Sequence, residues 1–290
     1  MFLTKDNFWF AGLKGAFRAP TWRALASSLV IVFCYYTFLY ILSERYVNFN
    51  VHMPGFVVYM LGYFIALLFY FRLNNSYYRW NDGYKSLAYM RANADTFSMK
   101  IRTYLKDTPE EIAYLSSMMK NYARSMRDIV RNFQDPKGMI EAEIGVIKKI
   151  ENAYHLPSRV NSLLEERINQ LYKNGTLSRV QFWDLNRCVT KNSEHLSSAE
   201  ALKGTPPPKT YVMHIRGFLI AYMLLIPFGF IEEFQAWMIL FLLVFFYFYA
   251  GLEIVSEVVE DPFGFDADDL PVEPLTIDLE NRVDGIIKTQ

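Results

Sequence analysis

The feature that most constrains this chain is a set of four long runs without Asp, Glu, Lys, Arg or His. Three of the runs contain 19 residues and one contains 15. An α-helix rises about 1.5 Å per residue, so about 20 apolar residues cross the roughly 30 Å hydrocarbon core of a bilayer. The runs therefore predict four membrane-spanning helices. They are Ala24 to Leu42, Met53 to Phe71, Gly217 to Ile231 and Phe234 to Leu252.

Buried helices of a soluble protein are the alternative interpretation, but surface helices of globular proteins keep a polar face. The stretches 30–33 and 239–248 are apolar all round, which favours the membrane. The third run contains Pro227 and Gly229, so we expect a kink or break there, followed by a tight turn at 232–233. The first run is too long for the core of a signal peptide and lacks a following Ala-x-Ala site, so we interpret it as a retained span.

Basic residues near the ends of the runs predict their orientation, because cytoplasmic flanks of membrane helices are enriched in Lys and Arg. Residues 1–23 carry four basic side chains against one acidic side chain, and basic residues also follow the second run and precede the third. The short links at 43–52 and 232–233 show no such excess. We therefore expect a multi-pass protein of the cell (inner) membrane with both termini in the cytoplasm.

The runs divide the chain into four segments. Residues 1–72 hold the N-terminal segment and the first two spans, 73–209 form a polar block, 210–252 hold the last two spans, and 253–290 form an acidic tail. The polar block is too long for an ordinary connection, so we expect it to fold as a cytoplasmic domain.

The polar block has a helical pattern. Apolar residues recur at steps of three and four from Glu110 to Phe133, and 163–171 behaves similarly. Turn signals at 135–138 and 173–176 separate these stretches, and a Pro-rich elbow at 205–208 precedes the third run. Because no β alternation of useful length is present, the sequence predicts an all-α membrane protein.

The charges balance over the chain but not along it. Lys+Arg and Asp+Glu both number 30, so a nucleic-acid partner relying on global positive charge is not expected. Residues 72–216 carry 23 basic and 15 acidic residues, a net of +8, whereas 253–290 carry 2 basic and 11 acidic residues, a net of −9. We expect the acidic tail to lie against the basic helices. A lipid-binding basic patch is less favoured, because the basic residues are spread singly.

The sequence offers no chemistry typical of an enzyme. Two Cys and four His lack the spacing of a metal site, and neither a phosphate-binding loop nor a hydrolase motif is present. We expect no catalytic residues, no cofactor and no metal. Charged residues, which pumps and proton-coupled carriers commonly use at mid-membrane, are missing from the runs. A passive pore or a structural membrane protein is therefore favoured.

Three sequence blocks are distinctive when taken together. They are Phe-Arg-Leu-Asn-Asn-Ser-Tyr-Tyr-Arg-Trp at 71–80, Gly-Thr-Pro-Pro-Pro at 204–208 with Ile-Pro-Phe-Gly at 226–229, and Glu-Asp-Pro-Phe-Gly-Phe-Asp-Ala-Asp-Asp-Leu-Pro at 260–271. With these blocks the chain resembles the bestrophin family, and more closely its prokaryotic branch. The resemblance extends from about Arg18 to Ile287. It implies a homopentamer of subunits with four membrane helices each, arranged around a central pore with a large helical cytoplasmic region.

The resemblance also implies where the pore is narrow. In this family the second membrane helix lines a neck of hydrophobic rings spaced four residues apart, and that neck falls here on Tyr63, Leu67 and Phe71. A second constriction in the cytoplasmic region falls on Val180. Steps of four place the three neck residues on one helical stripe, which otherwise serves to pack against neighbouring helices. Tyr63 departs from the Phe or aliphatic residues usual at its ring, which leaves Phe64 or Tyr59 as alternatives.

In animal bestrophins an acidic run after the fourth span forms part of a calcium clasp. Here Phe265 and Ala267 interrupt that run. We therefore interpret Asp266, Asp268 and Asp269 as caps or partners of basic groups, and we predict no activation by calcium.

The function expected from the sequence is passive conduction of small monovalent ions, chloride or sodium and potassium, by a homopentamer in the lipid bilayer. Aromatic rings present positive edges to anions or negative faces to cations, so the sign of the permeant ion stays open. The alternative is a membrane scaffold whose cytoplasmic helical domain binds a partner protein.

Overall fold

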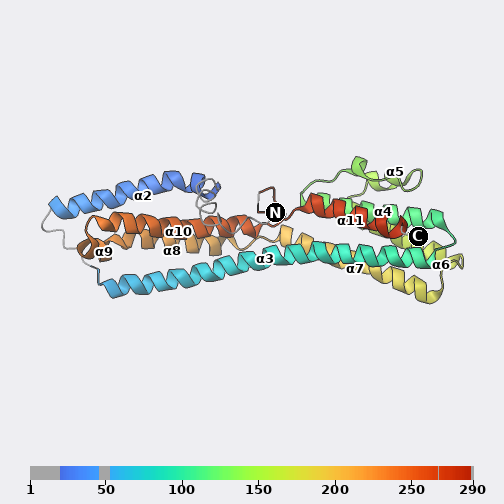
Figure 1. Ribbon diagram of the computed structural model, residues 1–290, viewed down its shortest axis with the longest axis horizontal. Helices are drawn as coiled ribbons and strands as arrows, with labels where there is room; N and C mark the ends of the chain where they lie inside the picture. The colour runs from blue at the N-terminus through green and yellow to red at the C-terminus, as the bar shows by residue number, and fades with distance from the viewer. Residues whose placement is uncertain (1–19, 46–52, 267, 289–290) are drawn as a thin grey trace, which may run out of the picture. The chain divides into compact units, whose positions relative to one another are not determined.

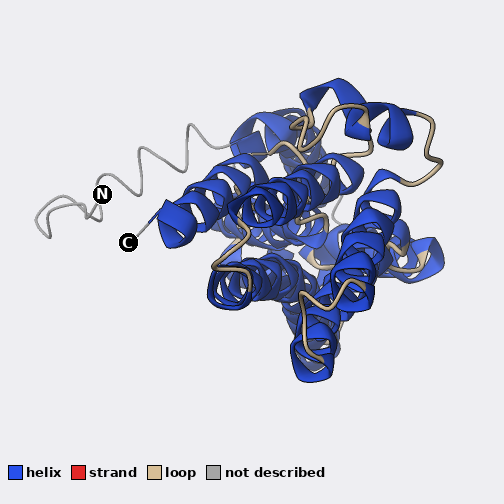
Figure 2. Ribbon diagram, turned by 90° about the vertical axis from the view of Figure 1, so that its right-hand side faces the viewer, coloured by secondary structure: helices blue, strands red, loops and turns tan. Residues whose placement is uncertain are grey.

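The computed structural model describes residues 20–45, 53–266 and 268–288, and these residues form only helices and loops (Figures 1 and 2). Residues 1–19 of the predicted basic flank 1–23, residues 46–52 of the predicted link 43–52, Ala267 and residues 289–290 lie outside the described residues. In chain order the helices are α2 (Pro20–Arg45), α3 (Gly55–Tyr104), α4 (Pro109–Val130), the short 3-10 helix η2 (Pro136–Gly138), α5 (Val146–Glu151), α6 (Leu156–Lys173), α7 (Arg179–Gly204), α8 (Lys209–Leu225), α9 (Pro227–Phe234), α10 (Trp237–Glu260) and α11 (Val272–Lys288).

The described residues form two compact units. The membrane unit comprises 20–45, 53–78 and 207–260, and the helical unit comprises 79–206 and 261–288 without 267. Helix α3 contributes its first half to the membrane unit and its second half to the helical unit.

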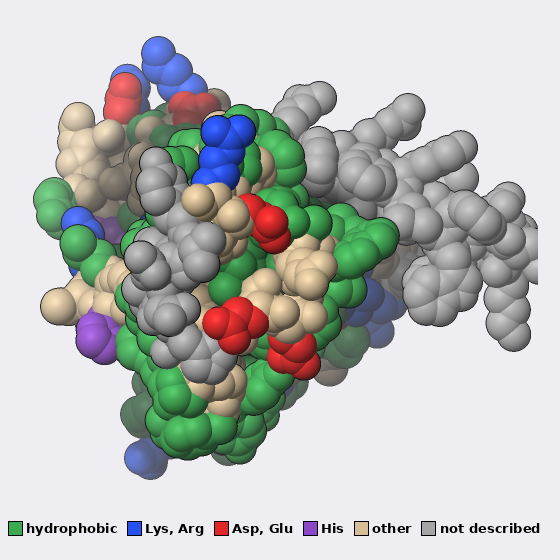
Figure 3. All heavy atoms as spheres, turned by 90° about the vertical axis from the view of Figure 1, so that its left-hand side faces the viewer, with side chains coloured by type: hydrophobic (Ala, Val, Ile, Leu, Met, Phe, Trp, Pro, Cys, Tyr) green, Lys and Arg blue, Asp and Glu red, His purple; other side chains and the backbone are tan. Residues whose placement is uncertain are grey.

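The membrane unit contains the four predicted spans. Four helical stretches are long and apolar enough to cross a membrane: Leu25–Arg45, Gly55–Tyr104, Lys209–Phe234 and Trp237–Glu260. Its buried side chains come from α2, α3, α8, α9 and α10, with Tyr36, Val58, Ile65 and Met238 almost fully enclosed. Many exposed side chains of these stretches are hydrophobic, among them Phe64 and Phe248. Figure 3 shows the face on the left-hand side of Figure 1, where hydrophobic groups lie beside acidic, basic and histidine side chains. Exposed apolar side chains along the spans suit contact with hydrocarbon rather than water.

The helix that contains the second predicted span continues past Phe71 to Tyr104, and it contains no proline. One detail differs from the sequence prediction. The predicted turn at 232–233 is wrong, since α9 includes both glutamates and ends at Phe234. The chain reverses at Gln235, which adopts a left-handed backbone with φ of 50°. The expected break at Pro227 is confirmed, because α8 ends at Leu225 and Pro227 begins α9.

The helical unit is built around the amphipathic helix α4. Its buried face follows the predicted spacing, but the helix ends at Val130, so the predicted member Phe133 lies beyond it and is exposed. Helix α4 packs against α6, α7 and α11. The two turn signals are also confirmed: Asp135 caps η2 by accepting from the backbone N–H of Lys137, and Gly175 turns the chain with φ of 77°. The fully buried residues of α4 include Leu115, Met118, Met119, Tyr122 and Met126.

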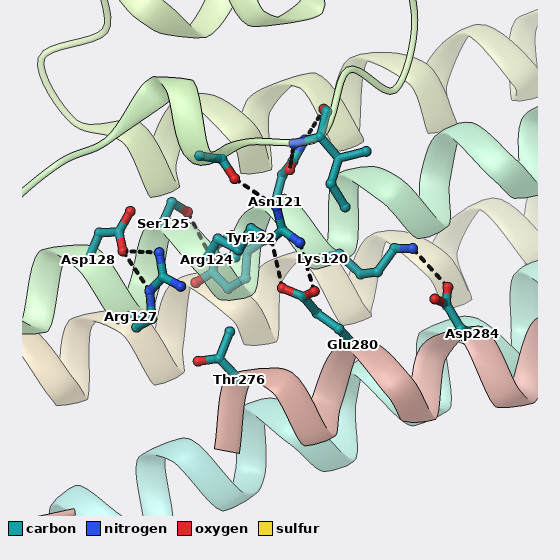
Figure 4. A network of polar contacts seen from close by, with 12 residues as sticks. Lys120, Asn121, Tyr122, Arg124, Ser125, Arg127, Asp128, Thr276, Glu280 and Asp284 are labelled. Atoms are coloured by element: carbon teal, nitrogen blue, oxygen red, sulfur yellow. Dashed lines mark hydrogen bonds and ion pairs between the residues drawn. The ribbon is translucent and has the colours of Figure 1, made fainter. Parts of the chain in front are cut away.

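The acidic tail lies against the basic helices, as the charge asymmetry predicts. Arg124 on α4 makes a two-pronged ion pair with Glu280 on α11, with N–O distances of 2.7 and 2.8 Å (Figure 4). Lys120 reaches Asp284 at 2.8 Å in the same view. The tail helix therefore neutralises basic groups of α4 and completes the core of this unit.

Candidate pore-lining site

The first half of α3 has one buried and one exposed face. Val58, Ile65, Phe69 and Arg72 are buried in the membrane unit. With a turn of about 100° per residue, these four positions fall within an arc of about 60°, and the position opposite its centre is close to Leu67. The packing of the unit thus turns Leu67 away from its own core.

The three predicted neck residues all lie on this exposed face. The exposed fractions are 71% for Tyr63, 40% for Leu67 and 49% for Phe71. The rings of Tyr63 and Phe64 meet edge to face with centroids 6.5 Å apart. Tyr59, which the sequence leaves as an alternative lining residue, has its ring 5.6 Å from that of Phe230. The structure brings Tyr63, Leu67 and Phe71 onto one exposed apolar stripe, called the neck stripe below.

A group of charged side chains follows the neck stripe directly. Arg72 is almost fully buried and pairs with two glutamates of α10, Glu253 at 3.6 Å and Glu260. Arg216 of α8 pairs with Glu253 and Glu257, each at 2.8 Å. The last residue of the neck stripe is therefore adjacent to a residue held by salt bridges to another helix. This cluster is not among the residues predicted from the sequence, although Arg72 and Glu253 each directly follow an apolar run, which is a usable signal.

Val180 lies in the helical unit, in the first turn of α7. Ser178 and Gln181 form a capping box that fixes the start of this helix. The Val180 side chain is 78% exposed, and it lines a hollow of about 640 Å³ together with Trp183, Arg187 and Lys191. Val180 is therefore an exposed side chain beside charged groups rather than part of the core.

A second hollow of about 640 Å³ lies between the second half of α3 and α7. Lys100 and the Tyr104 hydroxyl both donate to the carboxylate of Asp184, at 2.7 and 2.8 Å. These hydrogen bonds, from Lys100 first and Tyr104 second, lower the pKa of Asp184. Burial lowers the pKa of His195 in the same hollow, so its imidazole is neutral at neutral pH. Nothing in the sequence alone indicates this grouping.

The acidic segment after α10 is a folded loop. The Asp269 carboxylate accepts from the backbone N–H of Asp266 at 2.6 Å, and the Asp261 carboxylate pairs with Lys203 at 3.0 Å. The capping role expected of Asp269 is confirmed. Asp268 accepts from Trp80 Nε1 through its backbone carbonyl. Within the described ranges, no group of three or more His, Cys, Asp or Glu side chains is arranged to hold a metal ion.

Comparison with known proteins confirms the resemblance drawn from the sequence. The family model described as bacterial/fungal bestrophin protein matches residues 1–284. A voltage-dependent anion channel-forming protein of Nostoc sp. is 25% identical over 138 residues, which are 48% of this chain and 45% of that protein. The corresponding protein of Salmonella typhi, YneE, is 23% identical over 129 residues, 44% of this chain and 42% of that protein. These alignments span about half the length of the curated relatives.

Solved structures show the same fold. A point-mutated bacterial bestrophin homologue from Klebsiella pneumoniae superposes with a TM-score of 0.86 at 18% identity, covering 91% of this chain and 99% of that one. Another mutant of the Klebsiella homologue gives a TM-score of 0.86 at 19% identity, covering 92% of this chain and 100% of that one. Four apolar spans on this fold make the chain a multi-pass membrane protein. The chain belongs to the bacterial and fungal branch of the bestrophin family.

Proposed function

We propose that the protein is a passive ion channel that assembles as a homopentamer in the cell (inner) membrane, with both termini in the cytoplasm. Bestrophins are ion channels and not enzymes. In the proposed assembly, the neck stripe of each subunit faces a common axis, and Val180 narrows the cytoplasmic end of the pathway. The permeant species are small monovalent ions.

The single observation that carries this proposal is the exposed apolar face of α3 centred on Leu67. In an isolated subunit the neck stripe is uncovered, although the opposite side of the same helix is tightly packed. In an oligomer with closed rotational symmetry, the same stripe of every subunit can face the symmetry axis. Five copies then stack rings of Tyr63, Leu67 and Phe71.

Rings of apolar side chains can regulate conduction without a moving plug. Emptying a narrow apolar constriction of water requires little free energy. An ion cannot cross the emptied constriction, because it would lose its hydration shell there. Smaller or more polar side chains at the neck keep the constriction wet. Leu67 is the best-placed residue for this role, because it lies opposite the buried face of α3.

The relatives favour anions as the permeant species. The similar proteins of Nostoc sp. and Salmonella typhi are named voltage-dependent anion channel-forming proteins. We propose that this chain conducts anions as well.

Ion flux from proteoliposomes tests the proposed function. Wild-type protein is expected to release trapped chloride passively, and Leu67→Ala is expected to increase the rate severalfold because the neck stays hydrated. Leu240→Ala is the matched control, since Leu240 on α10 is exposed to a similar degree, at 51%. Absence of flux from a folded oligomer would contradict the channel and favour the membrane scaffold. Equal effects of the two substitutions would contradict the neck assignment.

A further inference from the structure

Several basic side chains of the helical unit are paired with the acidic tail. Lys120 and Arg124 on α4, and Arg131 directly after it, pair with Asp284, Glu280 and Glu273. Arg187 and Lys191 on α7 are exposed, and within the described parts of the chain neither makes an ion pair or a side-chain hydrogen bond. The tail therefore leaves a basic surface open on α7.

Arg187 and Lys191 lie on the same side of α7 as Val180. At about 100° per residue, positions 184, 187, 191 and 194 all fall within about 40° of position 180. The five residues Val180, Asp184, Arg187, Lys191 and Glu194 are called the α7 stripe below. They also line one continuous hollow.

The α7 stripe carries a net positive charge. The carboxylate of Asp184 is neutralised by Lys100, whose ammonium group lies 2.7 Å away. His195 is neutral at neutral pH, as described above. Counting Arg187 and Lys191 against Glu194 leaves one positive charge per chain.

We propose that Arg187 and Lys191 make the cytoplasmic part of the pathway selective for small anions. This inference rests on the proposed function, because it takes Val180 to face the pore. Five subunits then place two rings of basic side chains in line with the Val180 constriction, with a total of about five positive charges. Rings of Arg or Lys attract anions and repel cations in narrow pores, and hollows lined by charges of one sign concentrate the opposite ion.

Arg187 and Lys191 are not needed for the packing of the helical unit. The side chains of Arg187 and Lys191 do not contribute to the core of the helical unit, in which the neighbouring Leu185, Cys188 and Val189 are buried. Neutral variants of Arg187 and Lys191 are therefore expected to fold normally.

The test is the reversal potential of purified full-length protein in a planar bilayer under a KCl gradient. Wild-type protein is expected to favour chloride over potassium. The double variant Arg187→Gln with Lys191→Gln is expected to lower the chloride-to-potassium permeability ratio severalfold, with a smaller effect at high salt because the charges are screened. Glu194→Gln is expected to raise the same ratio. The charge-preserving exchange Arg187→Lys with Lys191→Arg is expected to leave it unchanged.

The matched control is Lys148→Gln with Lys149→Gln, which removes the same charge from exposed positions on α5. A wild-type preference for potassium overturns the proposal. So does a conducting double variant with the wild-type ratio, or an equal effect of the α5 control. These results leave the channel itself intact, whereas a wild-type protein that carries no current contradicts the proposed function.

Discussion

Arg72 Nε lies 3.6 Å from Glu253 Oε2, and both side chains are more than nine-tenths buried between α3 and α10. Neither of these two atoms has a hydrogen-bond partner among the described residues. Arg72 follows Phe71 of the neck stripe directly in the chain. The ion pair therefore fixes the rotation of α3 relative to α10 at the end of the proposed neck.

Breaking this pair is expected to destabilise the membrane unit strongly. Loss of one partner of a buried ion pair costs about 3–5 kcal/mol when the other charge is left uncompensated. Without Arg72, the buried Glu253 keeps only the partly exposed Arg216 as an ion-pair partner among the described residues, so we expect a loss toward the lower end of this range. Arg72→Met is therefore expected to lower the midpoint of thermal unfolding in detergent. Arg216→Met is the control, because the Arg216 side chain is 41% exposed and water can replace its contacts with the glutamates. An equal loss for both variants would show that burial of Arg72 has no special role.

Gly229 is expected to tolerate no larger side chain. A Cβ atom at this position would lie 2.5 Å from Cγ2 of Val58 on α3. Overpacking of this kind costs about 1–3 kcal/mol, so Gly229→Ala is expected to lower thermal stability. Val58→Ala in the same chain is expected to restore part of the loss. Gly217→Ala on α8 is the matched control, because a Cβ there meets nothing within 4 Å.

The tail helix is expected to depend on the two-pronged pair between Arg124 and Glu280. Glu280→Gln keeps the shape of the side chain but removes its charge, so we expect a loss of about 1.5–3 kcal/mol of unfolding free energy. Asp278→Asn on the same helix is expected to cost no more than about 1 kcal/mol, because its pair with Arg91 at 3.1 Å is partly exposed to solvent. Denaturant titration of the purified protein measures both. A reversed order would contradict the described packing of α11.

Conduction is expected to be insensitive to micromolar calcium. The Asp269 carboxylate is engaged by the backbone N–H of Asp266. This carboxylate oxygen of Asp269 is therefore already used in a hydrogen bond within the loop, whereas a calcium clasp needs oxygens that are available to bind the ion. Bilayer currents recorded with calcium and then with a chelator are expected to be the same. Steep activation by calcium would contradict this prediction.

The spans and the amphipathic helix α4 are predictable from the sequence because local apolarity and helical spacing determine them. The turn at Gln235 is not predictable in this way, because a left-handed backbone at a residue other than glycine depends on packing. The pair between Arg72 and Glu253 is also hidden from local patterns, since it requires α3 and α10 to pack in one register. The same limit applies to Lys100 and Asp184, which tertiary packing brings together.

The orientation of the neck residues is only partly predictable from the sequence. A step of four places Tyr63, Leu67 and Phe71 on one stripe, but spacing alone does not distinguish an exposed stripe from a buried one. In the structure, the opposite face of α3 is the buried one, because Val58, Ile65 and Phe69 pack into the core of the membrane unit.

The most direct test of the central claim is the current of the purified wild-type protein in a planar bilayer under a KCl gradient. We expect a steady passive current without any energy source. Its reversal potential is expected to lie closer to the equilibrium potential of chloride than to that of potassium. A correctly folded oligomer that carries no current would contradict the proposed channel. A current that reverses at the potassium equilibrium potential would contradict the proposed preference for anions.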